Sequence, residues 1–310
     1  MFAVPAFGAL AQVYPHKPIR IIVPFPPGGP SDMQARLFGA KLAEAWNQTT
    51  VIDNRGGANG IIGIELAAKA DPDGHTLILV SAGIAVQPSL HPQLPYDPVR
   101  DFAYITPVTS GPGIVVVNLS LPARSVPELI AYARAHPGGV LFGSAGSGAP
   151  SHLAVELLKV MTRVDMVHVP YKGMAQAITD LIGGQIQLSI PTMPGGLPHV
   201  KAGRLRALAV TGSQRSPAAP ELPTVAEAGV AGYQASNWYG FAAPAKTSRA
   251  IIGKLNHELS RIVAAPDVRE KLVNVGMDPM TSTPEQFADF VQSEIGKWAR
   301  VVKTAGIRVD

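Results

Sequence analysis

Two glycine-rich segments hold the residues of this sequence whose types and spacing could bind an anion. Residues 24–32 read PFPPGGPSD, and residues 143–152 read GSAGSGAPSH. Each follows an apolar run and precedes an amphipathic one, which predicts a strand, a tight turn and the start of a helix. A helix N-terminus offers unpaired N–H groups and partial positive charge, and glycine lets a ligand approach the backbone closely. We interpret residues 24–32 as a first anion cradle and residues 143–152 as a second, each for one carboxylate.

The candidate ligand-binding residues are mostly small residues at these turns. Three further candidates follow the predicted strand 76–81, because ligands of parallel sheets sit beyond the carboxyl ends of the strands. The candidates are Phe25, Pro27, Gly28, Gly29, Ser31 and Asp32 in the first cradle, Ser144, Ala145, Gly146, Gly148, Ser151 and His152 in the second, and Ser81, Ala82 and Gly83 at the strand end.

Several of these candidates also have a purely structural interpretation. Ser31 and Gln34 have the spacing of a capping box, so Ser31 could simply cap its helix. Asp32 suits the first turn of a helix but repels a carboxylate, so we expect it to order the turn or hold a water. Phe25 could lie against the ligand or belong to the core, and His152 could contact the ligand or brace the turn. The glycines could be ordinary tight-turn residues.

Enzyme motifs give little support for catalysis. The sequence has no G-x-S-x-G elbow around its candidate serines, no phosphate-binding loop, and no pair of histidines with zinc-ligand spacing and an acidic neighbour. Ser151 and His152 are adjacent, which points their side chains about 100° apart on a helix. A small esterase that uses Ser144 or Ser151 with His152 is therefore the disfavoured alternative to a binding protein.

Composition excludes other classes. The chain has 310 residues, 46% of them apolar, which is enough for two cores. Only 15% are charged, the formal net charge is +4, and no Lys/Arg run indicates a nucleic-acid partner. The chain has no cysteine, which excludes disulfides and thiolate metal sites. We expect no cofactor and no metal.

The N-terminus predicts export. Residues 1–11 are uncharged and mostly apolar, and they end in an A-x-A-like cleavage site after Ala11. The positively charged region of a signal peptide is missing, so residues 1–11 read as the remnant of one, or else as an apolar tail. No later run approaches the ~20 apolar residues of a membrane span, so we expect a soluble mature protein in the periplasm.

Apolar strands alternate with amphipathic helices along the chain, which predicts βαβ units and a mainly parallel sheet. A second cycle of the same alternation predicts a second α/β domain. The expected strands lie at 19–25, 50–54, 76–81, 113–118, 140–143, 164–169, 185–190, 205–210 and 238–243, and the expected helices at 31–46, 59–70, 126–135, 151–161 and 174–182, with two or three more at the C-terminus.

The chain resembles the periplasmic solute-binding proteins of tripartite tricarboxylate transporters, the Bug or TctC family. The resemblance extends from Tyr14 to Val309. It rests on the segments KPIR at 17–20, VPF at 23–25, the GGPSD turn at 28–32, DNRGG at 53–57, PDG at 72–74, LPYDPVRDF at 94–102, HVPYKG at 168–173, RALAV at 206–210, PTVAE at 223–227, and residues 298–306.

The resemblance implies a type II periplasmic binding protein fold, in which two α/β domains close on a ligand. We assign residues 12–117 with 240–310 to domain 1 and 118–239 to domain 2, joined by crossings near 115–119 and 237–242. The family holds carboxylates at the two strand-to-helix turns and presents them to membrane permease subunits, without a reaction. A sensory protein of the same fold, which reports to a membrane kinase, is the main alternative, and we expect a monomer.

One departure from the family bears on the ligand. Many members have an Asp three residues before the proline that is Pro194 here, where it can bind a ligand amine, but this chain has Pro191. A buried ammonium would then lack a charged partner. We therefore expect a dicarboxylate or an aromatic carboxylate rather than an amino acid, with Thr192 and Met193 shaping a less charged wall. Which carboxylate binds does not follow from the sequence.

Overall fold

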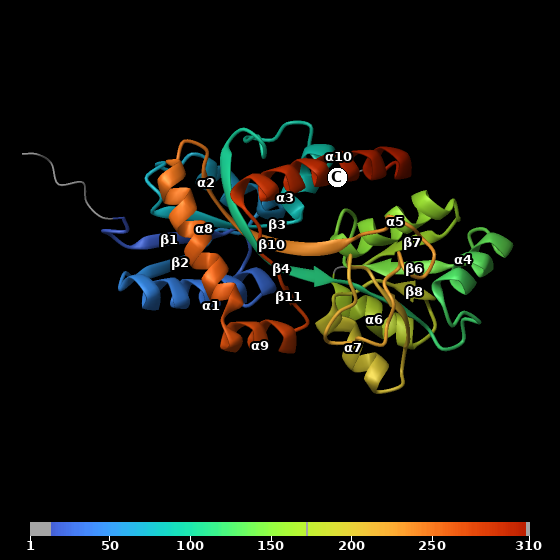
Figure 1. The fold of residues 1–310 in the computed structure, drawn as a ribbon. Coiled ribbons are helices and arrows are strands. Elements are labelled where there is room, and N and C mark those ends of the chain that lie inside the picture. The colour runs from blue at the N-terminus through green and yellow to red at the C-terminus, as the bar shows by residue number, and fades with distance from the viewer. Residues whose placement is uncertain (1–13, 172, 308–310) are drawn as a thin grey trace, which may run out of the picture.

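The computed structural model describes residues 14–171 and 173–307, which form two β-sheets with helices packed around them (Figure 1). The expected signal-peptide remnant at residues 1–11, and Lys172, lie outside the described residues. Within the described residues, no helix is both long enough and apolar enough to cross a membrane.

The first sheet has six strands in the order β11-β4-β10-β3-β1-β2. β1 is parallel to β2 and β3, as the βαβ pattern predicts, whereas β10 is antiparallel to β3 and β4. The strands are β1 (Ile19–Val23), β2 (Thr50–Asn54), β3 (Thr76–Ser81), β4 (Phe102–Pro112), β10 (Ser236–Pro244) and β11 (Asp278–Pro279). The helices packed on this sheet are α1 (Pro30–Trp46), α2 (Ile61–Ala68), α3 (Gly83–Leu90), α8 (Arg249–Ala264), α9 (Pro266–Asn274) and α10 (Pro284–Ala305), with the 3-10 helix η1 (Ala58–Gly60) before α2.

The second sheet has five strands in the order β7-β6-β8-β5-β9. β6 is parallel to β7 and β8, and β5 is antiparallel to β8 and β9, so both sheets are mixed rather than purely parallel. The strands are β5 (Ile114–Val117), β6 (Leu141–Ser144), β7 (Val167–Pro170), β8 (Leu188–Ser189) and β9 (Arg206–Val210), and the helices are α4 (Val126–Ala135), α5 (Pro150–Thr162), α6 (Met174–Ile182) and α7 (Met193–Lys201).

Local sequence signals explain where the helices form. In α1 the apolar spacing places Ala35, Phe38 and Leu42 on one face, and all three are buried against the sheet. The N-terminus of α10 is fixed by a capping box, in which the Thr283 side chain accepts from the backbone N–H of Gln286 and the Gln286 side chain accepts from that of Thr283. Side-chain caps of this kind satisfy N–H groups that the helix itself leaves unpaired.

Two chain crossings connect the sheets, and both fall earlier than the family resemblance implies. β4 ends in the first sheet at Pro112, and β5 begins in the second at Ile114, so residues 114–117 pair with β8 and β9. On the return, Ser236 already pairs with Pro112 in the first sheet. An apolar run of this kind predicts a buried strand but not the sheet it joins. The division of the chain into domains stays a proposal, with the change of sheet at 112–114 and 235–236.

Phe287 of α10 supports the strand β10, which forms the second crossing. Its ring is fully buried and makes edge contacts with the rings of Tyr104 and Trp238. Gly240 of β10 lies beneath it, where an added Cβ would come within 2.4 Å of Cζ of Phe287. The missing side chain of Gly240 therefore makes room for the ring, which joins α10 to the crossing strand.

Candidate functional site

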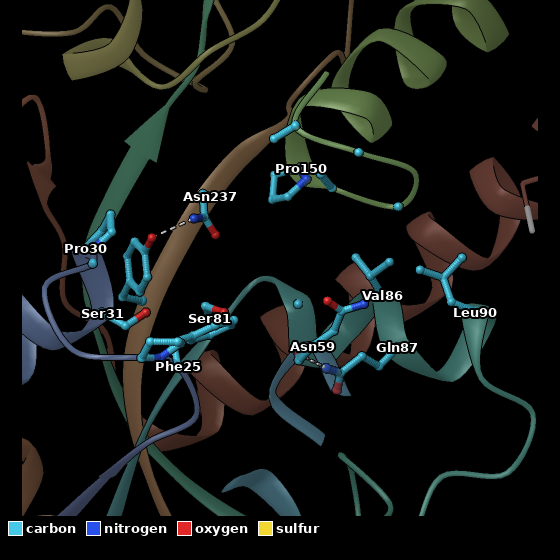
Figure 2. A pocket seen from close by; sticks show the side chains of 18 of the residues that line it. Phe25, Pro30, Ser31, Asn59, Ser81, Val86, Gln87, Leu90, Pro150 and Asn237 are labelled. Carbon is cyan, nitrogen blue, oxygen red and sulfur yellow. Dashed lines mark hydrogen bonds between the residues drawn. The ribbon is translucent and has the colours of Figure 1, made fainter. Parts of the chain in front are cut away.

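A cavity of about 580 Å³ lies between the two sheets and is lined from both sides. Three strand-to-helix turns reach it, those that join β1 to α1, β3 to α3, and β6 to α5. Figure 2 shows Phe25 and Ser81 from the first sheet on one side and Pro150 of α5 on the other. Because a helix begins at each turn, the cavity receives the positive ends of three helix dipoles.

The first cradle presents backbone N–H groups at the start of α1. Gly29 is the N-cap residue, and Pro30 follows at N1. Among the described residues, the N–H groups of Ser31 and Asp32 have no acceptor. Gly29 and Ser31 both line the cavity. These N–H groups, with the Ser31 hydroxyl, are suitable donors for an anion.

The capping-box interpretation of Ser31 is wrong. The helix begins two residues earlier than that box requires, because Pro30 takes the first helical position and Gly29, rather than Ser31, is the N-cap. The side-chain carbonyl of Gln34 instead accepts from the hydroxyl of Thr109 at 2.5 Å. Ser31 is thus not engaged in capping, and its hydroxyl faces the cavity edge.

Asp32 braces the first cradle from below and does not line the cavity. Its Oδ2 accepts from the backbone N–H of Gly28 at 2.9 Å and from Nε of Arg36 at 3.0 Å. The hydrogen bond from Arg36 lowers the pKa of this buried carboxyl to about 2, with a further contribution from Gly28. Gly28 has φ of +87°, which few other residues adopt, so the carboxylate fixes a turn that glycine makes possible. The expectation that Asp32 orders the turn agrees with this geometry.

We expect Asp32→Asn to destabilise the protein by about 1 to 2 kcal/mol at neutral pH, because it removes a charge-assisted pair and the favourable charge at the N-terminus of α1. A carboxylate with a lowered pKa stabilises the fold above its ordinary pKa of 3.8, and this contribution is lost as the pH falls towards about 2. Urea unfolding of both proteins at about pH 7 and about pH 2.5 tests this. If the two proteins differ in unfolding free energy by the same amount at both pH values, the role assigned to the Asp32 carboxylate is contradicted.

The second cradle repeats this arrangement at the start of α5. The order Gly28, Pro30, Ser31 recurs as Gly148, Pro150, Ser151. In both copies the glycine N–H donates to the side chain four residues later, here to Nδ1 of His152 at 3.0 Å. Gly148 has φ of +75°. Two turns with the same internal hydrogen bond therefore face one cavity from opposite sheets.

The hydroxyl of Ser151 holds the loop of the second cradle in place. Ser151 Oγ accepts from the backbone N–H of Ala145 at 3.0 Å. Among the described residues, the N–H groups of Ser147 and Ser151 have no acceptor. Ala145, Gly146 and Gly148 line the cavity. The donors that this cradle offers to a ligand are thus backbone groups.

Ser144 and His152 lie beneath the second cradle rather than in the cavity wall. Ser144 is fully buried, and its Oγ is 2.6 Å from Nε2 of His168. The rings of His152 and His168 stack with their centroids 3.8 Å apart. Burial, together with His152, lowers the pKa of His168 to about 4, so this ring is neutral at neutral pH. Ser144 and His168 have the contact of a nucleophile and a base, but the hydroxyl is not accessible to a substrate.

The third turn, between β3 and α3, differs from the prediction at one residue. Ser81 and Gly83 line the cavity as expected, but the side chain of Ala82 is buried in the core. Further along α3, Val86 and Leu90 form an apolar wall (Figure 2). This wall was not predictable from the sequence, because α3 is short and its apolar residues are equally typical of the core.

Polar side chains on two other segments complete the cavity. Asn237 of β10 donates from Nδ2 to the hydroxyl of Tyr239 at 2.8 Å, and both line the cavity. Asn59 lines it as well, and its carbonyl accepts from Nε2 of Gln87 at 2.7 Å (Figure 2). No sequence motif marks Asn237 as a cavity residue, because it is distant from both glycine-rich turns along the chain.

A side chamber of about 160 Å³ adjoins the main cavity, with which it shares Ala145, Pro150 and Asn237. Ser151 and Thr192 line this chamber rather than the main cavity. Among the described residues that line the two cavities, none is Asp, Glu, Lys or Arg. An anion there is therefore met by backbone N–H groups and neutral donors, and a cation finds no carboxylate.

The predicted residues divide into two groups. Those that line a cavity are Phe25, Pro27, Gly29, Ser31, Ser81, Gly83, Ala145, Gly146 and Gly148 in the main cavity, and Ser151 and Thr192 in the side chamber. Those that lie behind the lining are Gly28, Asp32, Ala82, Ser144 and His152. Contact with a ligand stays a prediction for all of them.

A family model and a relative of known family each match most of the chain. A family model described as the tripartite tricarboxylate transporter family receptor matches residues 34–307. Protein BugT of Bordetella pertussis is 39% identical over 301 residues, which cover 96% of this chain and 92% of that protein.

Two solved structures match closely. One, of an R. palustris protein with adipate, has 38% identity and a TM-score of 0.79, with 95% of this chain and 99% of that chain covered. The other, of a TctC solute binding protein from Polaromonas with no ligand, has 26% identity and a TM-score of 0.85, with 94% and 99% covered.

Proposed function

The chain belongs to the tripartite tricarboxylate transporter receptor family, and from that premise we propose that it captures a small carboxylate in the interdomain cavity and delivers it to membrane permease subunits. Its two-domain α/β fold is that of the family's solute-binding proteins, as the sequence predicted. We place this capture in the periplasm and assign it to a monomer.

The observation that carries the proposal is the pairing of two cradles across one cavity, whose lining contains no Asp, Glu, Lys or Arg among the residues that the structure describes. Each cradle offers unpaired N–H groups at the N-terminus of a helix, which stabilise an anion without a buried counter-charge. Two anion sites that face each other suit a solute with a carboxylate at one end and a second acceptor at the other. The apolar wall of Val86 and Leu90 suits the carbon chain or ring between them.

The cavity also argues against an amino acid as the solute. A buried ammonium group needs a carboxylate or several acceptors, and the described residues that line the two cavities include no acidic side chain. Pro191, at the position where many family members have Asp, lines the side chamber. Relatives support the class of solute, since one of them was solved with adipate.

We also propose that binding is not followed by a reaction. Ser151 Oγ accepts from the N–H of Ala145, and Nδ1 of His152 accepts from the N–H of Gly148. Both side chains are therefore hydrogen-bonded to backbone groups and not to each other, as a nucleophile and its base would be. Burst release from an activated ester, at one product per protein, would contradict this proposal.

We propose that the structure has the open conformation, with the two domains apart. The chain superimposes better on the Polaromonas protein solved with no ligand than on the protein with adipate, although it is less similar to the former in sequence. Sequence identity alone predicts the reverse order, so we attribute the order to a difference in the angle between domains. Closure around the solute then brings the two cradles together.

A thermal-shift screen tests the proposed function. We expect adipate, other dicarboxylates or aromatic carboxylates such as benzoate and terephthalate to raise the melting temperature, whereas aspartate and glutamate raise it less. A ligand at about a hundred times its Kd adds ~2.7 kcal/mol to the stability, which is measurable. Denatured protein is first checked by mass spectrometry for a copurified solute. A rise with aspartate as large as that with any dicarboxylate would contradict the predicted selectivity.

A further inference from the structure

A second crevice, of about 350 Å³, lies behind the crossing strands. Along β10 the side chains alternate between two faces, as in any strand. Asn237 and Tyr239 face the main cavity, whereas Ser236 and Trp238 line the crevice. The crevice therefore lies on the opposite face of β10 from the carboxylate cavity. We call it the rear crevice.

Both sheets contribute to the rear crevice. Residues 212–214 belong to the segment that follows β9, and Asp278 belongs to β11 of the first sheet. Oδ1 of Asp278 is 3.4 Å from Oγ of Ser216, which is fully buried in the segment after β9. This hydrogen bond connects β11 of the first sheet to the segment after β9 of the second. We call the crossing strands between the two sheets the hinge. Gly276, just before β11, also packs against Met193 of α7, where an added Cβ would lie 2.8 Å from Cβ of Met193.

Three polar groups in the rear crevice are poorly satisfied in this conformation. Nε1 of Trp238 and Oγ of Ser236 are buried without a hydrogen-bond partner among the described residues. The half-buried Asp278 has Ser216 as its side-chain partner, and burial raises its pKa to about 6. Each of these groups gains from contact with water.

In the part of the chain that the structure describes, no other charge compensates Asp278. On α10, Glu294 and Lys297 pair with each other, and Glu294 also accepts from Nε1 of Trp298. Arg215, next to Ser216, bonds to Glu227. β4 brings uncharged Thr109 and Ser110 opposite β11, and the basic residue in the last turn of α9, Lys271, is exposed.

We propose that the rear crevice is a proton-linked control on the hinge, in which protonated Asp278 holds the open conformation and ionised Asp278 favours closure. Rotation about the crossing strands that brings the two cradles together must separate the walls on the opposite face. Closure therefore opens the rear crevice, hydrates Asp278, Ser236 and Trp238, and breaks the contact with Ser216. This inference rests on the proposed function only in taking closure to be the motion that encloses a solute.

The sign of the pH dependence follows from the burial of Asp278. Its pKa is raised in the open conformation from 3.8 to about 6 and returns towards 3.8 when closure hydrates it. The closed conformation then binds fewer protons, so a rise in pH through this interval favours closure. A difference of up to about two pKa units allows the ratio of closed to open protein to rise by at most about a hundredfold.

The experiment measures the distance between α1, which packs on the first sheet, and α4, which belongs to the second, in the solute-free protein. The chain has no native cysteine, so Ala40→Cys on α1 and Ala131→Cys on α4, both exposed, accept spin labels specifically. Pulsed electron paramagnetic resonance between about pH 4.5 and 7.5 should show the shorter distance gaining population as the pH rises. Asp278→Asn, which is neutral throughout, should remain open over the whole range. Ser216→Ala removes a hydrogen bond that only the open conformation makes, so the closed conformation should gain population at lower pH than in the unaltered protein.

Asp289→Asn serves as the matched control, since Asp289 is exposed on α10 and this change should leave the transition unaltered. A distance that does not respond to pH, or a transition that persists in Asp278→Asn, overturns the proposal. Neither result bears on carboxylate binding, which the thermal-shift screen tests separately. Conversely, the absence of any bound carboxylate refutes the proposed function but not a distance transition that Asp278→Asn abolishes.

Discussion

Gly29→Val should abolish measurable binding of the carboxylate while the protein stays folded. Gly29 lines the main cavity as the N-cap of α1, and its φ of −84° is one that valine readily adopts. An added Cβ would meet no protein atom closer than the carbonyl oxygen of Pro26 at 3.9 Å, so the side chain has room within the fold. It would occupy the space where the ligand approaches the N–H groups of α1. Loss of one or two charge-assisted hydrogen bonds lowers the affinity by about 3 kcal/mol or more, on the order of a hundredfold.

Titration calorimetry with the carboxylate that the screen identifies measures this effect. Gly253→Val is the matched control, because Gly253 is exposed on α8 and an added Cβ there meets no atom within 4 Å. It should leave the affinity unchanged. Unaltered affinity in Gly29→Val would refute the first cradle as a ligand site. Gly148 is unsuitable for the same test, because valine at its φ of +75° is strained whatever the ligand does.

The sequence was sufficient to locate the two strand-to-helix turns of the cradles, because the signals involved are local. A glycine-rich turn after an apolar run and before an amphipathic helix specifies a strand, a turn and a helix N-terminus, wherever the helix later packs. Pro30 and Pro150 then fix the first helical residue in each copy. That two such turns face one cavity depends on how the two sheets are arranged, and the family resemblance supplied that expectation.

The direction of individual side chains could not be predicted in the same way. Asp32 and His152 each lie four residues after a cradle glycine, and the side chain of each accepts from the N–H of that glycine. Whether a side chain satisfies its own turn or faces a ligand depends on competing hydrogen bonds, which the sequence does not rank. Ala82 shows the same limit, since a shift of one residue separates the core from the cavity.

Residues on the crossing strand were missed for a different reason. Asn237 and Tyr239 reach the cavity because β10 passes between the two sheets, and no motif marks their positions (Figure 1). Their neighbours Ser236 and Trp238 face the rear crevice instead. The alternation is predictable from strand geometry, but the assignment of its two faces to two cavities requires the pairing of β10 with β3 and β4.

Phe287→Ala should cause the largest loss of stability of the changes considered. The ring is fully buried between Tyr104, Trp238 and Gly240, so its removal leaves a cavity beside the crossing strand. Such truncations cost about 3 to 5 kcal/mol. Urea unfolding, followed by far-ultraviolet circular dichroism, should show a lower midpoint. Phe290→Ala is the control, since Phe290 is only partly buried and its truncation should cost clearly less.

A double-mutant cycle with Gly240→Ala separates a specific contact from general damage to the core. Alone, Gly240→Ala places a Cβ within 2.4 Å of the Phe287 ring and should cost about 1 to 3 kcal/mol through overpacking. In the double variant the new methyl group enters the space that the ring has left. The combined loss should therefore be smaller than the sum of the two single losses. Simple additivity would show that the ring and the glycine do not meet, and that α10 does not support β10 at this point.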